Sequence, residues 1–235
     1  MQTPKAQKVE QMFDSIAPDY DRLNHLLSLG TDKSWRRRAL KQIITPSAPQ
    51  KILDVACGTG DFSIAIAKAA HPHSRITGAD LSQGMLDIMQ KKVAKEGLQK
   101  QISTMRCNCE NLPFEDSSFD RVTIAFGIRN FEHKEAALQE FARVLKPGGK
   151  IVILELSVPS KPWLKSLYNF YFTKILPVIG GLVSGNKGAY RYLPASVLNF
   201  PGPEAWCATM QDCGFRNVIH KAFTFGICRM YTGTK

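Results

Sequence analysis

The sequence predicts an α/β fold: a doubly wound, mostly parallel seven-stranded sheet with helices on both faces. Three observations support this prediction. Five short apolar runs alternate with amphipathic stretches of helix length, a glycine-rich turn follows the first run, and two more strand-like runs end the chain. The length of 235 residues suits one domain with an insertion. We expect a single domain with four parts, at residues 1–45, 51–156, 157–202 and 203–235.

The first part is expected to consist of helices. A helix over Lys5–Asp14 would place apolar residues on one side, and Thr31 or Asp32 can cap a second helix that Pro46 stops. From there the period changes to strands and helices in alternation, which implies right-handed crossovers and a parallel sheet. The expected strands are Lys51–Ala56, Arg75–Asp80, Ile102–Cys107, Asp120–Phe126 and Lys150–Leu156. The expected helices between them are Phe62–Ala70, Gly84–Lys95 and Lys134–Leu145.

Residues 157–202 interrupt this alternation and are interpreted as an insertion. After it, a helix over Glu204–Cys213 ends at Gly214. The strands Arg216–Phe223 and Gly226–Gly233 follow with a tight connection, so they predict an antiparallel hairpin at the edge of the sheet.

Composition limits the class of protein. The polar first ten residues contain no secretory signal, and no apolar run approaches the roughly 20 residues of a membrane-spanning helix, so a cytoplasmic protein is expected. Among six scattered cysteines, Cys107 and Cys109 stand too close together for ordinary zinc spacing, and we predict no metal site. The net charge is +11, and residues 151–200 carry five Lys or Arg against Glu155 alone. Such a segment suits nucleic acid, an anionic membrane or a solvated face.

The turn after the first strand predicts a ligand site. In it, Gly58 and Gly60 flank Thr59, and Asp54 precedes them. Glycines let the backbone approach a ligand, and the following helix offers free N–H groups. A dinucleotide site would need a third glycine where Ser63 stands. Asp54 instead suits a ligand that carries a cation or an amine.

The next two strands end in further candidate ligand groups. Asp80 can accept hydrogen bonds from both ribose hydroxyls, because Ser82 is the better cap for the following helix. After the third strand, Asn108 can accept from an adenine amino group, and the Cys109 backbone N–H can meet a ring nitrogen. Residues 112–114 suit either a wall for the base or core packing. In this order the segments resemble the class I methyltransferases over residues 51–156, which implies S-adenosylmethionine as cofactor.

Two longer segments narrow the resemblance. Tyr20–Trp35 and Arg143–Ser157 resemble the two signatures of the ubiquinone/menaquinone biosynthesis C-methyltransferases, and residues 125–130 and 190–196 also resemble that family. One departure is Asp32, where the family usually has histidine; we expect it to cap the helix. The resemblance implies C-methylation of a polyprenylated quinol, with demethylmenaquinol favoured. The alternatives are 2-methoxy-6-polyprenyl-1,4-benzoquinol and another lipid.

The turn Phe126–Asn130 is consistent with this chemistry. It has neither the Pro-Pro-aromatic motif of adenine N-methyltransferases nor the Pro-Cys nucleophile of pyrimidine C-methyltransferases. A hydroquinol needs neither, since loss of one phenolic proton activates the adjacent ring carbon. We expect Arg129 to stabilise the phenolate, Asn130 to orient a hydroxyl or a water that accepts the proton, and Tyr20 to close over the cofactor. The alternative for Arg129 is a salt bridge to an acid such as Glu132.

The segment Trp163–Gly181 is aromatic and apolar on more than one helical face, and lysines lie along it. It fits a lid that touches the membrane surface, where a prenylated quinol is found. A helical cap on the core or a homodimer face is the alternative. Nucleic acid is not expected as a partner, because no recognition motif is present and the basic segment is apolar rather than a Lys/Arg stripe.

Overall fold

The computed structural model describes residues 3–159, 161–175 and 187–235. Its centre is a seven-stranded sheet with the strand order β3-β2-β1-β4-β5-β7-β6. The two final strands are antiparallel to their neighbours, and the other pairs are parallel, so the predicted fold class is confirmed. The strands are β1 (Lys51–Val55), β2 (Arg75–Asp80), β3 (Ile102–Arg106), β4 (Phe119–Ala125), β5 (Leu145–Leu156), β6 (Arg216–Phe223) and β7 (Cys228–Thr234).

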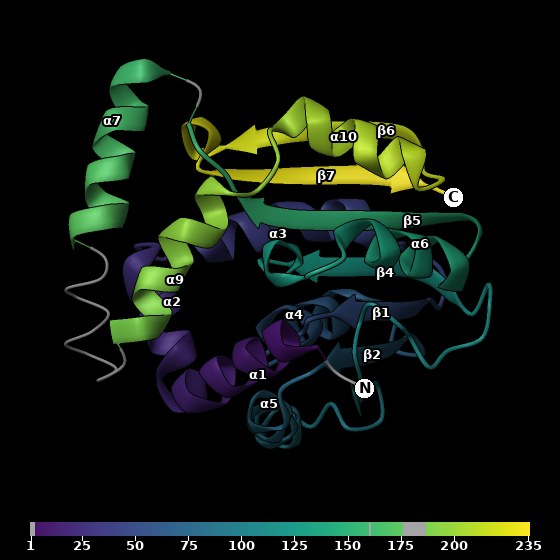
Figure 1. The fold of residues 1–235 in the computed structure, drawn as a ribbon. Helices are drawn as coiled ribbons and strands as arrows, with labels where there is room; N and C mark the ends of the chain where they lie inside the picture. The colour runs from purple at the N-terminus through teal and green to yellow at the C-terminus, as the bar shows by residue number, and fades with distance from the viewer. Residues whose placement is uncertain (1–2, 160, 176–186) are drawn as a thin grey trace.

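The chain reverses its direction of winding between β1 and β4, which are neighbours although two strands separate them in sequence. In an open α/β sheet, ligands bind beyond the carboxyl ends of strands at such a switch point. The turns after β1 and β4 therefore face a common site. Figure 1 shows α2 and α9 gathered at the end of the sheet towards which the arrows of β4 and β5 point.

Both faces of the sheet are covered by helices because alternate residues of its strands are apolar. On β1, Leu53 and Val55 belong to one buried cluster and Ile52 to another, as the two-residue period of a strand requires. The first cluster includes residues of α6 (Lys134–Val144) and α10 (Pro203–Asp212). The second includes residues of α3 (Thr31–Ile43), α4 (Asp61–Ala69) and α5 (Gln83–Lys95).

Strand β5 begins earlier than the sequence predicts. Leu145 already pairs with Phe119, and the register then shifts before Lys150 pairs with Arg121. The two glycines between them precede the predicted strand Lys150–Leu156, and in the structure they form an irregular part of the strand. A Cβ on Gly149 would lie 2.7 Å from the Lys146 carbonyl oxygen, so this close passage requires glycine.

The N-terminal helices α1 (Pro4–Ile16) and α2 (Tyr20–Leu27) pack beside α5 and α9 (Lys187–Leu198). The expected helical character of this part is confirmed, but the cap predicted for α3 is wrong. Gly30 occupies the N-cap position with φ of 71° and no side-chain cap bond. Asp32 lies inside the first turn of the helix, and its side chain is buried.

The inserted segment contributes α7 (Pro162–Phe170), a π-helical turn (Tyr171–Ile175) and α9. Figure 1 shows α7 standing apart from the sheet, beyond α9. One side of α7 faces the protein, where Tyr168 is buried, whereas Trp163 and Phe170 are 66% and 57% exposed. The rest of the aromatic segment predicted as a lid, residues 176–181, lies outside the described residues. Within the described ranges, no helix combines the length and apolarity that a membrane crossing needs.

Candidate cofactor and substrate site

The turn after β1 has a backbone that favours glycine. Gly58 and Gly60 have φ of 55° and 82°, in the left-handed region. Gly60 is also the N-cap of α4, and a Cβ there would lie 2.4 Å from Met89 Cγ on α5. Glycine is therefore required at position 60 for both its dihedral angles and the close approach of α5. The turn brings the N-terminus of α4 against the cavity that the predicted site residues share.

Asp54 lies at the base of this turn and is 1% exposed. Its carboxylate accepts hydrogen bonds from Ser63 Oγ at 2.5 Å and from Thr123 Oγ1 at 2.9 Å. Burial raises the pKa of Asp54 to about 6, and these two bonds oppose the rise. Ser63, which occupies the place of a dinucleotide glycine, thus serves as a partner for the acid.

Asp80 is hydrogen-bonded through both carboxylate oxygens. Oδ2 accepts from the Gly58 backbone N–H at 2.8 Å, and Oδ1 accepts from the Ser82 N–H at 3.0 Å. Ser82 caps α5 by accepting from the Met85 N–H, as predicted. Burial raises the pKa of Asp80, and the backbone bonds oppose this. Asp80 is therefore not the cap of α5. Its carboxylate connects the turn after β1, at Gly58, with the turn after β2, at Ser82.

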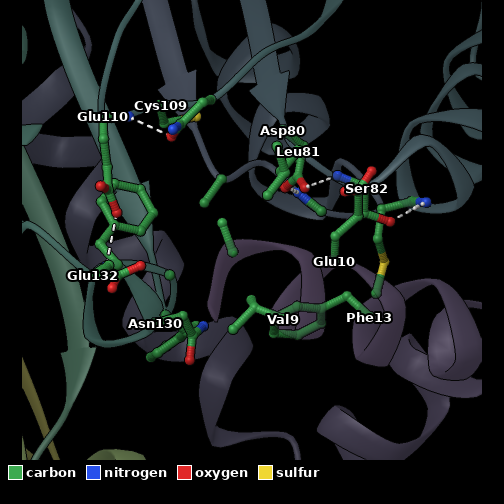
Figure 2. Close-up of a pocket in the computed structure, with 18 of the residues that line it drawn as sticks. Val9, Glu10, Phe13, Asp80, Leu81, Ser82, Cys109, Glu110, Asn130 and Glu132 are labelled. Carbon is green, nitrogen blue, oxygen red and sulfur yellow. Dashed lines mark hydrogen bonds between the residues drawn. The ribbon is translucent and has the colours of Figure 1, made fainter. Parts of the chain in front are cut away.

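A cavity of about 780 Å³ lies between these residues. Figure 2 shows Asp80 and Ser82 on one side of it, Cys109 on another, and Val9 and Phe13 of α1 facing them. Asn108 also lines it, but its Oδ1 accepts from the Glu110 N–H at 2.9 Å. The sequence did not indicate that α1 would form a wall, because Val9 and Phe13 fit an ordinary buried helix face equally well. Residues 112–114 are absent from the lining of this cavity, and Leu112 packs in the core.

Two further cavities meet the first one at Tyr20. The second, of about 640 Å³, has a mostly apolar wall that includes Trp35, Phe126 and Arg129. The third, of about 370 Å³, lies along the glycine turn and is lined by Asp54, Thr59, Asp21, Asp61 and Arg36, among others. Tyr20 lines all three. Its side chain therefore stands where a cofactor on one side would meet a substrate on the other.

Arg129 forms a buried ion pair with Glu155, whereas Glu132 was the partner considered from the sequence. Its Nη1 lies 2.8 Å from Glu155 Oε1, and its backbone N–H donates to Glu155 Oε2 at 3.1 Å. Its Nη1 also donates to the Phe126 carbonyl. Glu132 is not its partner; the Glu132 N–H donates to Glu110. Burial lowers the pKa of Arg129, but the charge and hydrogen bond of Glu155 together with the attraction of Tyr20 and Tyr192 outweigh it, so the net pKa is raised and the guanidinium stays charged.

The remaining predicted residues lie close by. Asn130 ends the short 3₁₀ turn Ile128–Asn130, and its buried Oδ1 has no hydrogen-bond partner among the described residues. It lines the first cavity. Burial raises the pKa of Tyr20, against the attraction of the Arg129 charge, so the phenol is neutral. The structure thus gathers Tyr20, Asp54, Gly58, Thr59, Asp80, Asn108, Cys109, Arg129 and Asn130 around connected cavities, with Gly60 shaping the turn between them.

The residues present fit S-adenosylmethionine: the buried acids line the cavities and can accept hydrogen bonds from ribose hydroxyls and an amino group, and helix α4 begins at the glycine turn beside them. Fold and site together define a class I S-adenosylmethionine-dependent methyltransferase. Solved structures share this fold. The chain resembles a Thermotoga maritima S-adenosylmethionine-dependent methyltransferase with a TM-score of 0.67 and 20% identity, over 96% of this chain and 99% of that one. An Aquifex aeolicus enzyme has a TM-score of 0.62 and 17% identity, over 85% and 88%.

The chain belongs to the ubiE/COQ5 methyltransferase family, whose model matches residues 1–235. Two relatives illustrate the similarity. The demethylmenaquinone methyltransferase of Bacteroides fragilis is 47% identical over 98% of this chain and 94% of its own length. The ubiquinone/menaquinone biosynthesis C-methyltransferase of Geotalea daltonii is 50% identical over 99% and 98%. The protein is an S-adenosylmethionine-dependent C-methyltransferase.

Proposed function

We propose that the protein methylates a ring carbon of demethylmenaquinol to form menaquinol. The observation that carries this proposal is the second cavity, a mostly apolar chamber that meets the cofactor cavities at Tyr20 and has Arg129 in its wall. Relatives over nearly the whole chain are named for demethylmenaquinone or for ubiquinone/menaquinone biosynthesis. The mostly apolar wall of this chamber suits the ring of a quinol.

The chain's own residues would align and polarise the ring. When bound, the cofactor supplies an electrophilic methyl group. Arg129 stabilises negative charge on a ring oxygen, and its ion pair with Glu155 fixes its direction. The unpaired Oδ1 of Asn130 accepts a hydrogen bond from a ring hydroxyl or a bound water. Tyr20, neutral and wedged between the cavities, keeps the ring in line with the methyl group.

A fourth cavity offers a path for the prenyl tail. It measures about 400 Å³ and is lined by Met12, Phe13 and Ile16 of the N-terminal helices and by Tyr192 of α9. It shares Tyr20, Asn24, Arg129 and Leu193 with the second cavity. A ring held at the shared residues could therefore extend its tail between α1 and α9, away from the cofactor.

Helix α7 suits peripheral contact with the inner face of the cell membrane. Its exposed Trp163 and Phe170 can enter the interface, and Lys161 and Lys165 can meet anionic headgroups. The alternative is a homodimer face. Flotation with anionic liposomes tests the first, and the Trp163→Ala/Phe170→Ala variant should float less than wild type. The homodimer would be supported if the wild-type protein does not float and light scattering shows that it is a dimer, while the Trp163→Ala/Phe170→Ala variant is a monomer.

The substrate is tested by methyl transfer to soluble naphthoquinol and benzoquinol analogues under reducing conditions. We expect the naphthoquinol to be methylated faster. Methylation of neither ring would overturn quinol methylation, and a preference for the benzoquinol would assign the protein to the ubiquinone reaction instead. Mass of the product after the quinol is reoxidised gives the readout, and a reaction without cofactor is the control.

A further inference from the structure

Asp32 is a buried carboxylate in the wall of the second cavity and is 4% exposed. Its Oδ1 accepts from Ser28 Oγ at 2.7 Å, and its Oδ2 lies 2.9 Å from His25 Nδ1. The Arg36 guanidinium donates to the same Oδ2. A carboxylate has about four lone-pair positions, so these three partners leave one position open. Asp32 does not cap α3; it lies in the first turn of the helix, where an acid is favoured by the helix dipole, and its side chain also reaches the wall of the cavity.

The other groups of the second cavity are unsuited to accept a proton. Arg36 and Arg129 are cations, and burial raises the pKa of Tyr20, which keeps its phenol neutral. Asn24 and Ser28 are neutral, and the rest of the described lining is apolar. Among the described residues that line this cavity, Asp32 is the one carboxylate, so it is the strongest base available to a bound quinol.

His25 continues from Asp32 towards the surface. Its Nδ1 faces Asp32, and its Nε2 lies 3.4 Å from Asp61 Oδ2. His25 and Asp61 do not line the second cavity; they line an open hollow on the surface that shares Arg36 with the second cavity and both Arg36 and Asp61 with the third. Asp32 therefore lies between the second cavity and His25, and His25 lies between Asp32 and the surface. An imidazole between two carboxylates can take a proton on one nitrogen and release one from the other.

We propose that Asp32 accepts the proton of the reacting quinol hydroxyl and that His25 passes it to the surface. The inference rests on the proposed quinol methylation and names a residue for it. The geometry differs from a Ser-His-Asp triad, because here the carboxylate faces the substrate and the histidine faces solvent. Asp32 would be a catalytic residue and His25 a positioning and relay residue.

The proton balance of the step is simple. As the ring carbon forms its bond to the methyl group, Asp32 takes the hydroxyl proton, and the O–H electron pair forms a ring carbonyl. The electron pair of the methyl–sulfur bond stays with sulfur. The methylated carbon then loses its proton while the carbonyl oxygen gains one, which restores the aromatic ring without further net change. One proton is released overall, and it leaves through His25.

A carboxylate suits this step although a free phenol is a far weaker acid. The hydroxyl becomes strongly acidic as the ring gives electrons to the methyl group, so proton transfer is needed only in the transition state. A positioned base of this kind contributes about 10²–10⁴-fold in rate. Arg36 donates a hydrogen bond to Asp32 and holds the carboxylate in a fixed direction.

The decisive variant is Asp32→Ala, which removes the base and leaves room for a small carboxylate. With the soluble naphthoquinol, we expect kcat to fall by about 10²–10⁴-fold. Cofactor Kd, measured by calorimetry, should stay within about threefold of wild type. Added formate should restore part of the rate in proportion to its concentration. Asp32→Asn should lose as much activity but gain nothing from formate, because the amide fills the space.

Asp120→Asn is the matched control. Like Asp32, Asp120 is paired with a cation, here Lys146, and it accepts a further hydrogen bond, from the Lys51 backbone N–H. It belongs to β4, near the opposite end of the strand from the site. This variant should keep wild-type kcat. If Asp32→Ala fails to fold, Asp32→Asn alone decides through its kcat and cofactor Kd. The solvent isotope effect on kcat then replaces the formate experiment as the test of proton transfer, and it should differ between wild type and Asp32→Asn.

The outcomes separate the inference from the function. No methylation by wild type would overturn the quinol proposal itself. Methylation by wild type together with a kcat within threefold in the Asp32 variants would overturn the role of Asp32. Parallel loss of cofactor binding, or a loss of activity that formate does not relieve in a folded Asp32→Ala protein, would show that Asp32 and His25 only brace α2 against α3.

Discussion

Because Arg129 forms a buried ion pair with Glu155, we expect it to contribute to the stability of the protein as well as to the reaction. The side chains are 7% and 0% exposed, and the ions lie 2.8 Å apart. Glu155 also accepts the backbone N–H groups of Arg129 and Leu156. Replacing Arg129 with Met removes the cation and one of the three hydrogen bonds, and it leaves the carboxylate buried without a counter-charge.

Removal of one partner of a buried ion pair typically costs 3–5 kcal/mol. The two backbone bonds that Glu155 keeps place the expected loss for Arg129→Met near the lower end, about 3 kcal/mol. For a protein of this size, each kcal/mol shifts Tm by roughly 2–4 °C, so Tm should fall by roughly 6–12 °C. Arg129→Met/Glu155→Gln should lose less than Arg129→Met, because the neutral amide needs no counter-charge.

The assay is urea unfolding of wild type, the two single variants and the double variant, which form a double-mutant cycle. Turnover and cofactor Kd are measured on the same four proteins below the unfolding range. The double variant should regain stability but not kcat, because the charge at the quinol is still missing. A cost below about 1 kcal/mol for Arg129→Met, or a double variant no more stable than it, would refute the argument from the buried pair.

Three other predictions concern the cofactor side. Because burial raises the pKa of Asp54 to about 6 from 3.8, folding takes up a proton between these values, and this group makes stability fall as pH rises from about 4 to 6. Asp54→Asn should remove this pH dependence, which amounts to about 3 kcal/mol in the free energy of unfolding over that range, as urea unfolding at several pH values would show. An unchanged pH dependence would contradict the raised pKa of Asp54. Gly60→Ala should weaken cofactor binding and stability more than Gly97→Ala, since both glycines have positive φ but only position 60 meets another side chain; equal losses in calorimetry and unfolding would contradict this. Ser82→Ala should cost about 1 kcal/mol of stability through the lost cap, and a loss under 0.3 kcal/mol would count against it.

The order of strands and helices could be predicted from the sequence because periodicity is a local property. Ile52 and Leu53 alternate between the two cores, and that pattern is visible without any tertiary information. The start of β5 could not be predicted in this way. Residues 147–149 carry turn chemistry, and only the neighbouring strand β4 extends β5 through them.

The features of the site that depend on local sequence could also be predicted, and those that depend on tertiary contacts could not. The glycine turn, Asp80 and the cap at Ser82 are sequence-local features, and they could be placed correctly. The partner of Arg129 could not, because Glu155 is 26 positions away and becomes a neighbour only when β4 and β5 pair. The role of Asp32 could not be predicted for a similar reason. At the start of a helix an acid usually caps, and only the packing of α2 on α3 turns this one towards His25 and the cavity.

The two sides of the site carry opposite charge, and this bears on how the reaction proceeds. Asp54 and Asp80 lie along the cofactor cavities, Arg129 lines the proposed quinol cavity, and Arg36 lines both the quinol cavity and the third cavity. Methyl transfer removes one positive charge from the acidic side and releases one proton on the cationic side. Two arginines alone would oppose that proton, although they favour a phenolate. A carboxylate between them, connected to the surface through an imidazole, lets the cavity bind a neutral quinol and still discharge the proton.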